Sequence, residues 1–346
     1  MWAASRRPTG GGQFPLRRRA ARRPSERREM SKALTIVLVM LVGAAGVLVA
    51  FAIDPPGEGS PKQPCVFHPA TMTVQGCTVM KSDTGSSGDP ASLWGIIDCA
   101  SDSRASVVAS GGDPHPTATG APQGDDDHRR LMVLDGDDVS GERCELGRNE
   151  QRYGDDGGDG TFQLYREGQR RITFVSFRLP EDFHTEHTSF QNVLQMKQTQ
   201  PSNNAGGIPV LSLQATNGEW RLNHANSPGG GTSETLWEAP ASTGVWVRVA
   251  LDVTYSQDGG EGRVKLYLDR NGDGDTLDAE EQSPAITTHT LKYETADADG
   301  EETDGVAPGD SIPSHLRVGI YHDPSLACPP PSGCSVEVDN VQVVGP

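Results

Sequence analysis

The sequence contains no C-x-x-C pair and, beyond residue 53, has few positive charges. Without paired cysteines of this spacing, a structural zinc site is unsupported. Of 47 acidic and 30 basic residues, two acidic and ten basic residues fall in the first 53 positions, so 45 acids face 20 bases in the remainder. Such an acidic surface repels nucleic acid, and we expect no nucleic-acid partner.

Helical periodicity is also missing from the larger part of the chain. Beyond residue 54 no segment repeats its apolar residues every 3.6 positions over the length of a helix, and no internal repeat is visible. Residues 245–255 instead alternate, with valine or leucine at every second position from 247 to 253. Similar strand-like segments cover residues 131–135, 172–179, 192–197, 208–215, 262–268, 316–322 and 335–344. Many short strands with Gly-rich turns predict an all-β, antiparallel β-sandwich or jelly roll.

One long apolar run stands out near the amino terminus. Residues 33–53 are 21 consecutive residues without a charge, which as a helix would cross a bilayer core of about 30 Å. The arginine-rich residues 1–32 predict a disordered cytoplasmic tail, which places the rest of the chain outside the cell. The alternative is a signal peptide cleaved near Ala52, after which the protein is secreted. We therefore expect one N-terminal transmembrane helix ahead of the β-domain, or a secreted domain.

The remaining chain divides simply. Residues 54–64 read as a stiff linker, and residues 65–346 as the β-domain, with a long surface loop at about 100–130. All six cysteines lie beyond the apolar run, so disulfides are expected in an oxidising compartment. Only Cys328–Cys334, which brackets a short Pro-rich turn, is specific enough to predict as a pair. We expect a monomer.

Three of the predicted strands carry unusual side chains on the face that does not bear the apolar residues. Strand parity assigns to these faces Arg143 and Glu145, Gln195 and Lys197, and Arg317 and Tyr321. Each pair has an ordinary explanation as well: a cross-strand ion pair, a solvent-facing polar pair, or a half-buried aromatic residue. Their joint occurrence favours a site.

These stretches resemble the signature motifs of jelly-roll (concanavalin-like) polysaccharide lyases, the group that includes alginate, glucuronan and heparin-I-type lyases. R-C-E-L at residues 143–146 resembles the R-x-E-L motif, Q-M-K at 195–197 the Q-x-H motif, and H-L-R-V-G-I-Y at 315–321 the Y-F-K-A-G-x-Y motif. The order along the chain also matches. Each motif alone is weak, but three in order on predicted strands are moderately specific.

The resemblance implies an acidic, uronate-containing polysaccharide as substrate and cleavage by β-elimination. Arg143, Gln195 and Lys197 would stabilise the charge that develops on the substrate carboxylate, and Tyr321 would act as the acid and, where geometry allows, as the base. Glu145, Arg317 and His315 would contact the substrate. Two positions depart from the family pattern: Lys197 replaces the family's histidine, and His315, an alternative base, replaces its first tyrosine.

Residues 269–280, D-R-N-G-D-G-D-T-L-D-A-E, match the calcium-loop pattern D-x-[DN]-x-[DN]-G-x₅-E. The oxygen donors at the pattern's positions are those of Asp269, Asn271, Asp273, Asp275 and Glu280. Because the loop follows a strand, we expect an EF-hand-like Ca²⁺ site in a hairpin, with a structural role. The alternative is an acidic, solvated tip that binds no ion.

Two rival functions remain. The same sandwich could be a non-catalytic carbohydrate-binding or adhesion module, which the loss of the family's histidine favours. A retaining glycosidase would need two carboxylates about 5–5.5 Å apart. Glu145 and Glu150 would face opposite sides of one straight strand, so this function ranks last.

Overall fold

The computed structural model describes residues 64–84, 93–123, 126–138, 141–147, 164–198, 207–295 and 308–346. The chain divides into two compact units, residues 1–57 and 58–346, and all described residues belong to the second. The basic tail, the apolar run at 33–53 and all but the last residue of the linker therefore lie outside the described residues. Within the described ranges, no helix is long and apolar enough to cross a bilayer.

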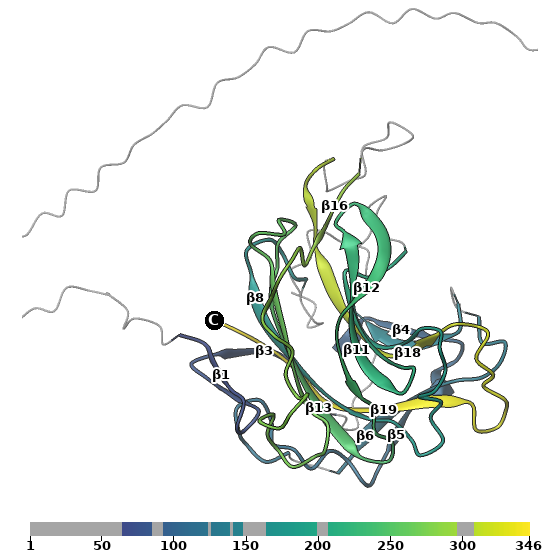
Figure 1. Ribbon diagram of the computed structural model, residues 1–346. Helices are drawn as coiled ribbons and strands as arrows, with labels where there is room; N and C mark the ends of the chain where they lie inside the picture. Colours follow the sequence, from purple (N-terminus) through teal and green to yellow (C-terminus); the bar gives the residue numbers. More distant parts are fainter. Residues whose placement is uncertain are drawn as a thin grey trace, which may run out of the picture. The chain divides into compact units, whose positions relative to one another are not determined.

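The second unit is an all-β antiparallel sandwich of two sheets (Figure 1). The first sheet has the order β12 (Gly230–Pro240), β11 (Glu219–Ser227), β10 (Leu211–Thr216), β9 (Gln191–Gln198), β18 (Ser314–His322), β7 (Arg143–Gly147) and β4 (Ile96–Cys99). The second has the order β15 (Ile286–Thr287), β14 (Arg263–Asp269), β13 (Trp246–Thr254), β8 (Arg170–Arg178), β19 (Cys334–Gly345), β6 (His128–Val133) and β5 (Ala105–Val108). Strand β3 (Thr78–Asp83) also pairs with β19. Two small hairpins, β1 (Val66–His68) with β2 (Thr73–Gln75) and β16 (Lys292–Tyr293) with β17 (Ser311–Ile312), and a single 3₁₀ turn, η1 (Asp102–Arg104), complete the described elements.

The core between the sheets follows the alternation of the sequence. Every second residue of β13 from Val247 to Val253 is buried in it, as are Leu316, Val318 and Ile320 of β18. Because neighbouring side chains on a strand point to opposite faces, this core leaves the alternate residues of β18 for the other face of the first sheet.

The outer face of the second sheet is covered, which the sequence pattern did not predict. Hairpin β1–β2 and the segment around Ala118 pack on it and form a second apolar cluster with Phe174 and Ala250. Arg248, on the same face, is fully buried as a result. Several residues that a two-layer sandwich would expose to solvent are therefore interior.

The structure differs from the prediction at further places as well. Strands β11 and β12 were not predicted, because polar residues and glycine interrupt their apolar alternation. Part of the predicted surface loop at 100–130 forms β5 and the start of β6, which pair with each other. Three disulfides join Cys65 to Cys77, Cys99 to Cys144, and Cys328 to Cys334, the pair that the sequence suggested.

Candidate functional site

Three neighbouring strands of the first sheet bring the motif residues together. Strand β18 lies between β9 and β7. In this register Arg317 is opposite Gln195 of β9 and Gly147 of β7, while Tyr321 is opposite Arg143. Segments separated by more than 100 residues in sequence thus become cross-strand neighbours, whose side chains on one face touch.

Glu145 is the centre of this group. Its side chain is fully buried, and Gln195 donates a hydrogen bond from Nε2 to Oε1. Nη1 of Arg143 lies 3.4 Å from the other oxygen, and Nη1 of Arg317 lies 3.5 Å from it. A buried carboxylate surrounded by three donors fixes the orientation of those donors.

Tyr321 is half-buried, at the open side of the group. The guanidinium carbon of Arg143 lies 3.8 Å from the centre of its ring, and the Phe190 ring packs edge-on at 5.0 Å. Gly141 leaves room for the phenol, since a Cβ at that position would lie 3.3 Å from the tyrosine oxygen. The ring is therefore held between a cation and an aromatic side chain, with its orientation restricted.

His315 and Lys197 are opposite each other, two residue pairs away from Arg317 and Gln195. Because β18 begins at Ser314, His315 shares the face of Arg317, but it is fully buried. Its Nε2 accepts a hydrogen bond from Nε of Arg317 at 3.2 Å. Lys197 is partly exposed and donates from Nζ to the Gly207 carbonyl at 2.7 Å.

Gly319 is required by the pairing of β18 with β7. Its φ of 146° is strained for any other residue, and a Cβ there would lie 2.2 Å from the carbonyl oxygen of Cys144 on β7. The space beside Gly319 is therefore filled by the neighbouring strand, and the glycine allows β7 to pair with β18.

Asn192 joins the site through a bulge that sequence parity misses. Simple alternation places it with Leu194 and Met196, on the core face. The register instead shifts beside it on both neighbouring strands, so that it pairs with Tyr321 and Gln214. Gln214 donates to Asn192 Oδ1 at 2.9 Å. A bulge turns one side chain to the opposite face, and no residue type in this stretch indicates that a bulge is present.

A row of polar residues continues from the site across the sheet. It runs in register through Tyr321, Asn192, Gln214 and Arg221 to Glu238 on the edge strand β12. Arg221 is partly exposed and lies three strands from Tyr321. At about 4.8 Å per strand this is a separation of about 14 Å. The row provides hydrogen-bonding groups along a path perpendicular to the strands.

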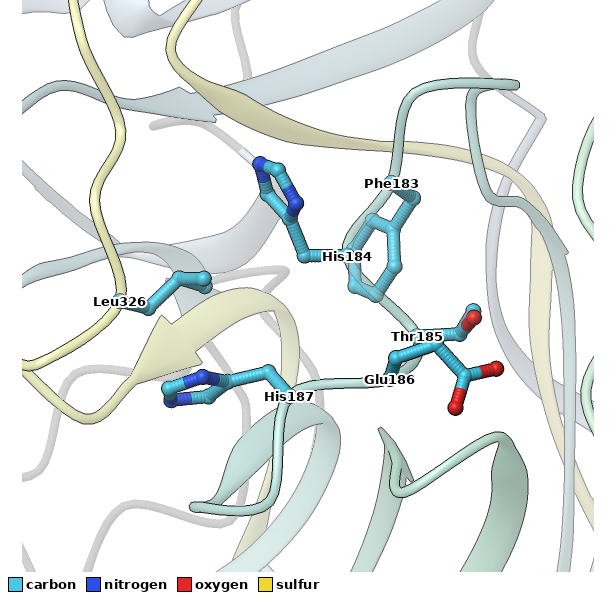
Figure 2. A pocket seen from close by; sticks show the side chains of 6 residues that line it. All are labelled: Phe183, His184, Thr185, Glu186, His187 and Leu326. Atoms are coloured by element: carbon cyan, nitrogen blue, oxygen red, sulfur yellow. The ribbon is translucent and has the colours of Figure 1, made fainter.

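A hollow of about 410 Å³ lies beside the end of β18 (Figure 2). The segment 183–187 and Leu326, from the loop that follows β18, line it. In the view of Figure 2, Leu326 lies between the imidazole rings of His184 and His187, while Thr185 and Glu186 lie on the opposite side. Backbone hydrogen bonds from Asn217 and Gly218 to residues 187 and 185 hold this segment in place.

The predicted calcium loop follows β14. Asp269 is fully buried, and its Oδ2 accepts a hydrogen bond from the backbone N–H of Gly274 at 2.8 Å. Gly274 has a φ of 95°. Glu280 is exposed, 4.0 Å from Arg270, whereas the next residue, Glu281, is fully buried and accepts from the N–H of Arg270.

Among the described residues, three candidate metal-ligand atoms come within 4.8 Å of one another only at His322, Cys328 and Cys334. Since those two sulfurs form a disulfide, they are not available as thiolate ligands. The carboxylates of the calcium loop are spread further apart in this conformation.

Sequence reasoning also missed Asp98 of β4. Its Oδ2 lies 2.8 Å from Nη1 of Arg317 and 3.7 Å from Nη1 of Arg143. No strand was predicted at residues 96–99, because four residues without clear alternation do not reveal an edge strand.

Comparisons with known proteins agree with the fold. A family model described as "Polysaccharide lyase" matches residues 92–338. The endo-β-1,4-glucuronan lyase from the fungus Trichoderma reesei superposes with a TM-score of 0.50 at 17% identity, covering 78% of this chain and 96% of that one. A marine alginate lyase from Aplysia kurodai gives 0.48 at 12% identity, covering 78% and 100%. A search of curated proteins found no match.

Proposed function

Because the chain belongs to the polysaccharide lyase family, whose members are carbon–oxygen lyases, we propose that it cleaves a uronate-containing polysaccharide by β-elimination. The observation that supports this substrate class is the cross-strand group of Arg143, Gln195 and Arg317 around Glu145, with Arg143 against the Tyr321 ring. Cations and an amide beside a phenol suit a substrate with a carboxylate next to the proton that must leave.

The chemistry assigns each group a task. The C5 proton of a uronic acid is barely acidic while the neighbouring carboxylate is charged. Donors from Arg143, Gln195 and Lys197 stabilise the enediolate that forms when the C5–H bond breaks. Tyr321, as the phenolate, takes that proton and, as the phenol so formed, passes it to O4 as the C4–O4 bond breaks and the C4=C5 bond forms. Since one phenol serves both steps, the elimination is syn.

The test uses the full-length chain with glucuronan, alginate, pectate and glycosaminoglycans. Glucuronan comes first because the fold neighbour from Trichoderma reesei is a glucuronan lyase. We expect ultraviolet absorbance of an unsaturated uronate on at least one polymer. Tyr321→Phe should lower kcat by about 10²–10⁴-fold, the usual contribution of acid–base catalysis.

Tyr267→Phe is the matched control, since this tyrosine lies in the apolar cluster on the outer face of the second sheet. It should leave the rate unchanged. Product formation by Tyr321→Phe at the wild-type rate would contradict the assignment, and no product from the wild type on any polymer would contradict the lyase.

A non-catalytic carbohydrate-binding module is the second candidate. It is favoured by one feature, the lysine at 197 where the family motif has histidine. Such a module would retain a polysaccharide in an affinity assay without forming unsaturated ends, so the same panel separates the two functions.

We further propose that the loop after β14 binds Ca²⁺. The donor set is made of oxygens, which Ca²⁺ prefers, and Gly274 provides the sharp turn of such loops. The pKa of Glu281 is raised by burial and by the charges of Asp269 and Asp278, while two backbone hydrogen bonds lower it. A cation among these carboxylates would relieve their repulsion and hold the loop.

The three disulfides indicate an extracellular domain. We propose that residues 33–53 anchor this domain in the cell membrane by a single span, the alternative being secretion after cleavage near Ala52. Cell fractionation decides between them: the intact chain in the membrane fraction supports the anchor, and a shortened chain in the medium supports secretion.

A further inference from the structure

Asp98 and Glu145 are directly opposite each other on neighbouring strands β4 and β7. Like charges in this position repel, so the arrangement requires compensation. Arg317 supplies it, because its Nη1 lies 2.8 Å from Asp98 and 3.5 Å from Glu145. Arg143 contributes as well, at 3.7 Å from Asp98 and 3.4 Å from Glu145. Two carboxylates and two guanidiniums therefore form one compact charge group.

Asp98 makes the closer of these two contacts with Arg317. At 2.8 Å it is a charge-assisted hydrogen bond, whereas the Glu145 contact at 3.5 Å is longer. The Arg317 side chain is 6% exposed, so nearby carboxylates, and not water, must stabilise its positive charge. Nε of the same guanidinium donates to His315, which fixes the plane of the group from the other end.

The strand that carries Asp98 is held in an unusual way. β4 is a four-residue edge strand, and β7 is its partner in the sheet. The next cross-strand pair, Cys99 with Cys144, is a disulfide. A covalent link one residue from Asp98 keeps this short strand against β7, and with it the carboxylate against Arg317.

We propose that Asp98 is a positioning residue of the site, which holds the Arg317 and Arg143 guanidiniums in the orientation that faces the substrate, and that the Cys99–Cys144 disulfide fixes Asp98 in place. This inference rests on the proposed function. Asp98 affects the reaction indirectly, through Arg317, Arg143 and Glu145, because its carboxylate lies next to these residues.

The test compares Asp98→Ala and Asp98→Asn with Asp102→Asn in the full-length chain. Asp102 is an exposed acid on η1, just beyond the disulfide, and serves as the matched control. Asp98→Ala should lower kcat by about 10- to 100-fold with KM changed less than about threefold. Misaligned groups mainly weaken stabilisation of the transition state and affect substrate binding less. Asp98→Asn, which keeps an acceptor oxygen, should lie between Asp98→Ala and wild type, and Asp102→Asn should match wild type.

A second measurement is independent of activity. The Nε–H resonance of Arg317 in nitrogen–proton NMR spectra, assigned with Arg317→Lys, should shift in Asp98→Ala and stay in place in Asp102→Asn. If the wild type cleaves no polymer, the lyase proposal fails while this resonance still tests Asp98. An unchanged resonance in Asp98→Ala, or wild-type kcat per folded molecule, would overturn the positioning role.

The disulfide is tested by the double variant Cys99→Ala/Cys144→Ala against Cys65→Ala/Cys77→Ala. The first should shift the Arg317 resonance and lower kcat as Asp98→Ala does, and the second should do neither. Circular dichroism gives the folded fraction by which each rate is divided. Equal behaviour of the two double variants would remove the disulfide from the proposal.

Discussion

Glu337 shows how far one buried carboxylate depends on its neighbours. On β19 it is opposite Arg130 of β6 and Arg178 of β8, with carboxylate–guanidinium distances of 2.8 and 3.0 Å. His128 lies 3.6 Å away. Burial by itself would raise the pKa of Glu337, but the hydrogen bond from Arg130, the nearby imidazole of His128 and the charge of Arg178 outweigh it and lower the pKa to about 2.

Glu337→Gln should therefore change how stability depends on pH. A carboxyl with a depressed pKa in the folded state stabilises fully above its ordinary value of 4.5, and this stabilisation is lost as the pH falls toward 2. We expect the variant to lose up to about 3 kcal/mol at pH 7, and to show a flatter decline of stability between pH 4.5 and 2.

Urea unfolding across this pH range measures the effect. Glu261→Gln, at an exposed glutamate, is the control and should reproduce the wild-type profile. A variant whose stability declines in acid as steeply as wild type would show that Glu337 is not the carboxyl responsible.

The loop after β14 illustrates what an element adds to a motif. The sequence pattern selects Glu280 as the closing ligand, but the chain turns so that Glu280 is exposed and Glu281 is buried in the loop. We propose Glu281 as the closing ligand. This choice gives two adjacent glutamates with opposite expected behaviour.

Calcium at millimolar concentration should raise the melting temperature of the wild type by a few degrees. Loose extracellular sites bind at about 10⁻⁴–10⁻³ M, which corresponds to about 0.4–1.4 kcal/mol at 1 mM. Asp273→Ala and Glu281→Gln should erase the rise, and Glu280→Gln should retain it. Differential scanning calorimetry with and without a chelator measures this rise. The reverse result for the two glutamates would make Glu280 the closing ligand. No rise in the wild type would contradict the calcium site.

At the scale of the whole sheet, the polar row from Tyr321 to Arg221 suggests that several sugar residues bind along it. Arg221→Ala should raise KM about two- to fivefold for long oligouronates, since a partly exposed charge pair contributes about 0.2–1 kcal/mol. The shortest cleaved oligomer should be unaffected, because it does not reach β11.

Arg263→Ala, an exposed arginine on the second sheet, is the control for a general loss of positive charge. Kinetics over a ladder of oligomer lengths separates the outcomes. An equal rise of KM at every length would mean that substrate does not follow this row.

Sequence alone predicts the strands with clean alternation, the class of fold and the faces of Gln195, Arg317 and Tyr321, because side-chain period and β-branched residues are local properties. The family motifs added the expected chemistry, and the short spacing between Cys328 and Cys334 suggested their disulfide.

Which strands are neighbours depends on long-range pairing in the folded protein. The order β9–β18–β7 places the three motifs together, and neither it nor the pairing of Asp98 with Glu145 can be read from local pattern. The bulge at Asn192 and the covering of Arg248 likewise depend on partners distant in sequence. Such features arise from long-range pairing and packing, whose free energy is set by contacts that a single segment of sequence does not contain.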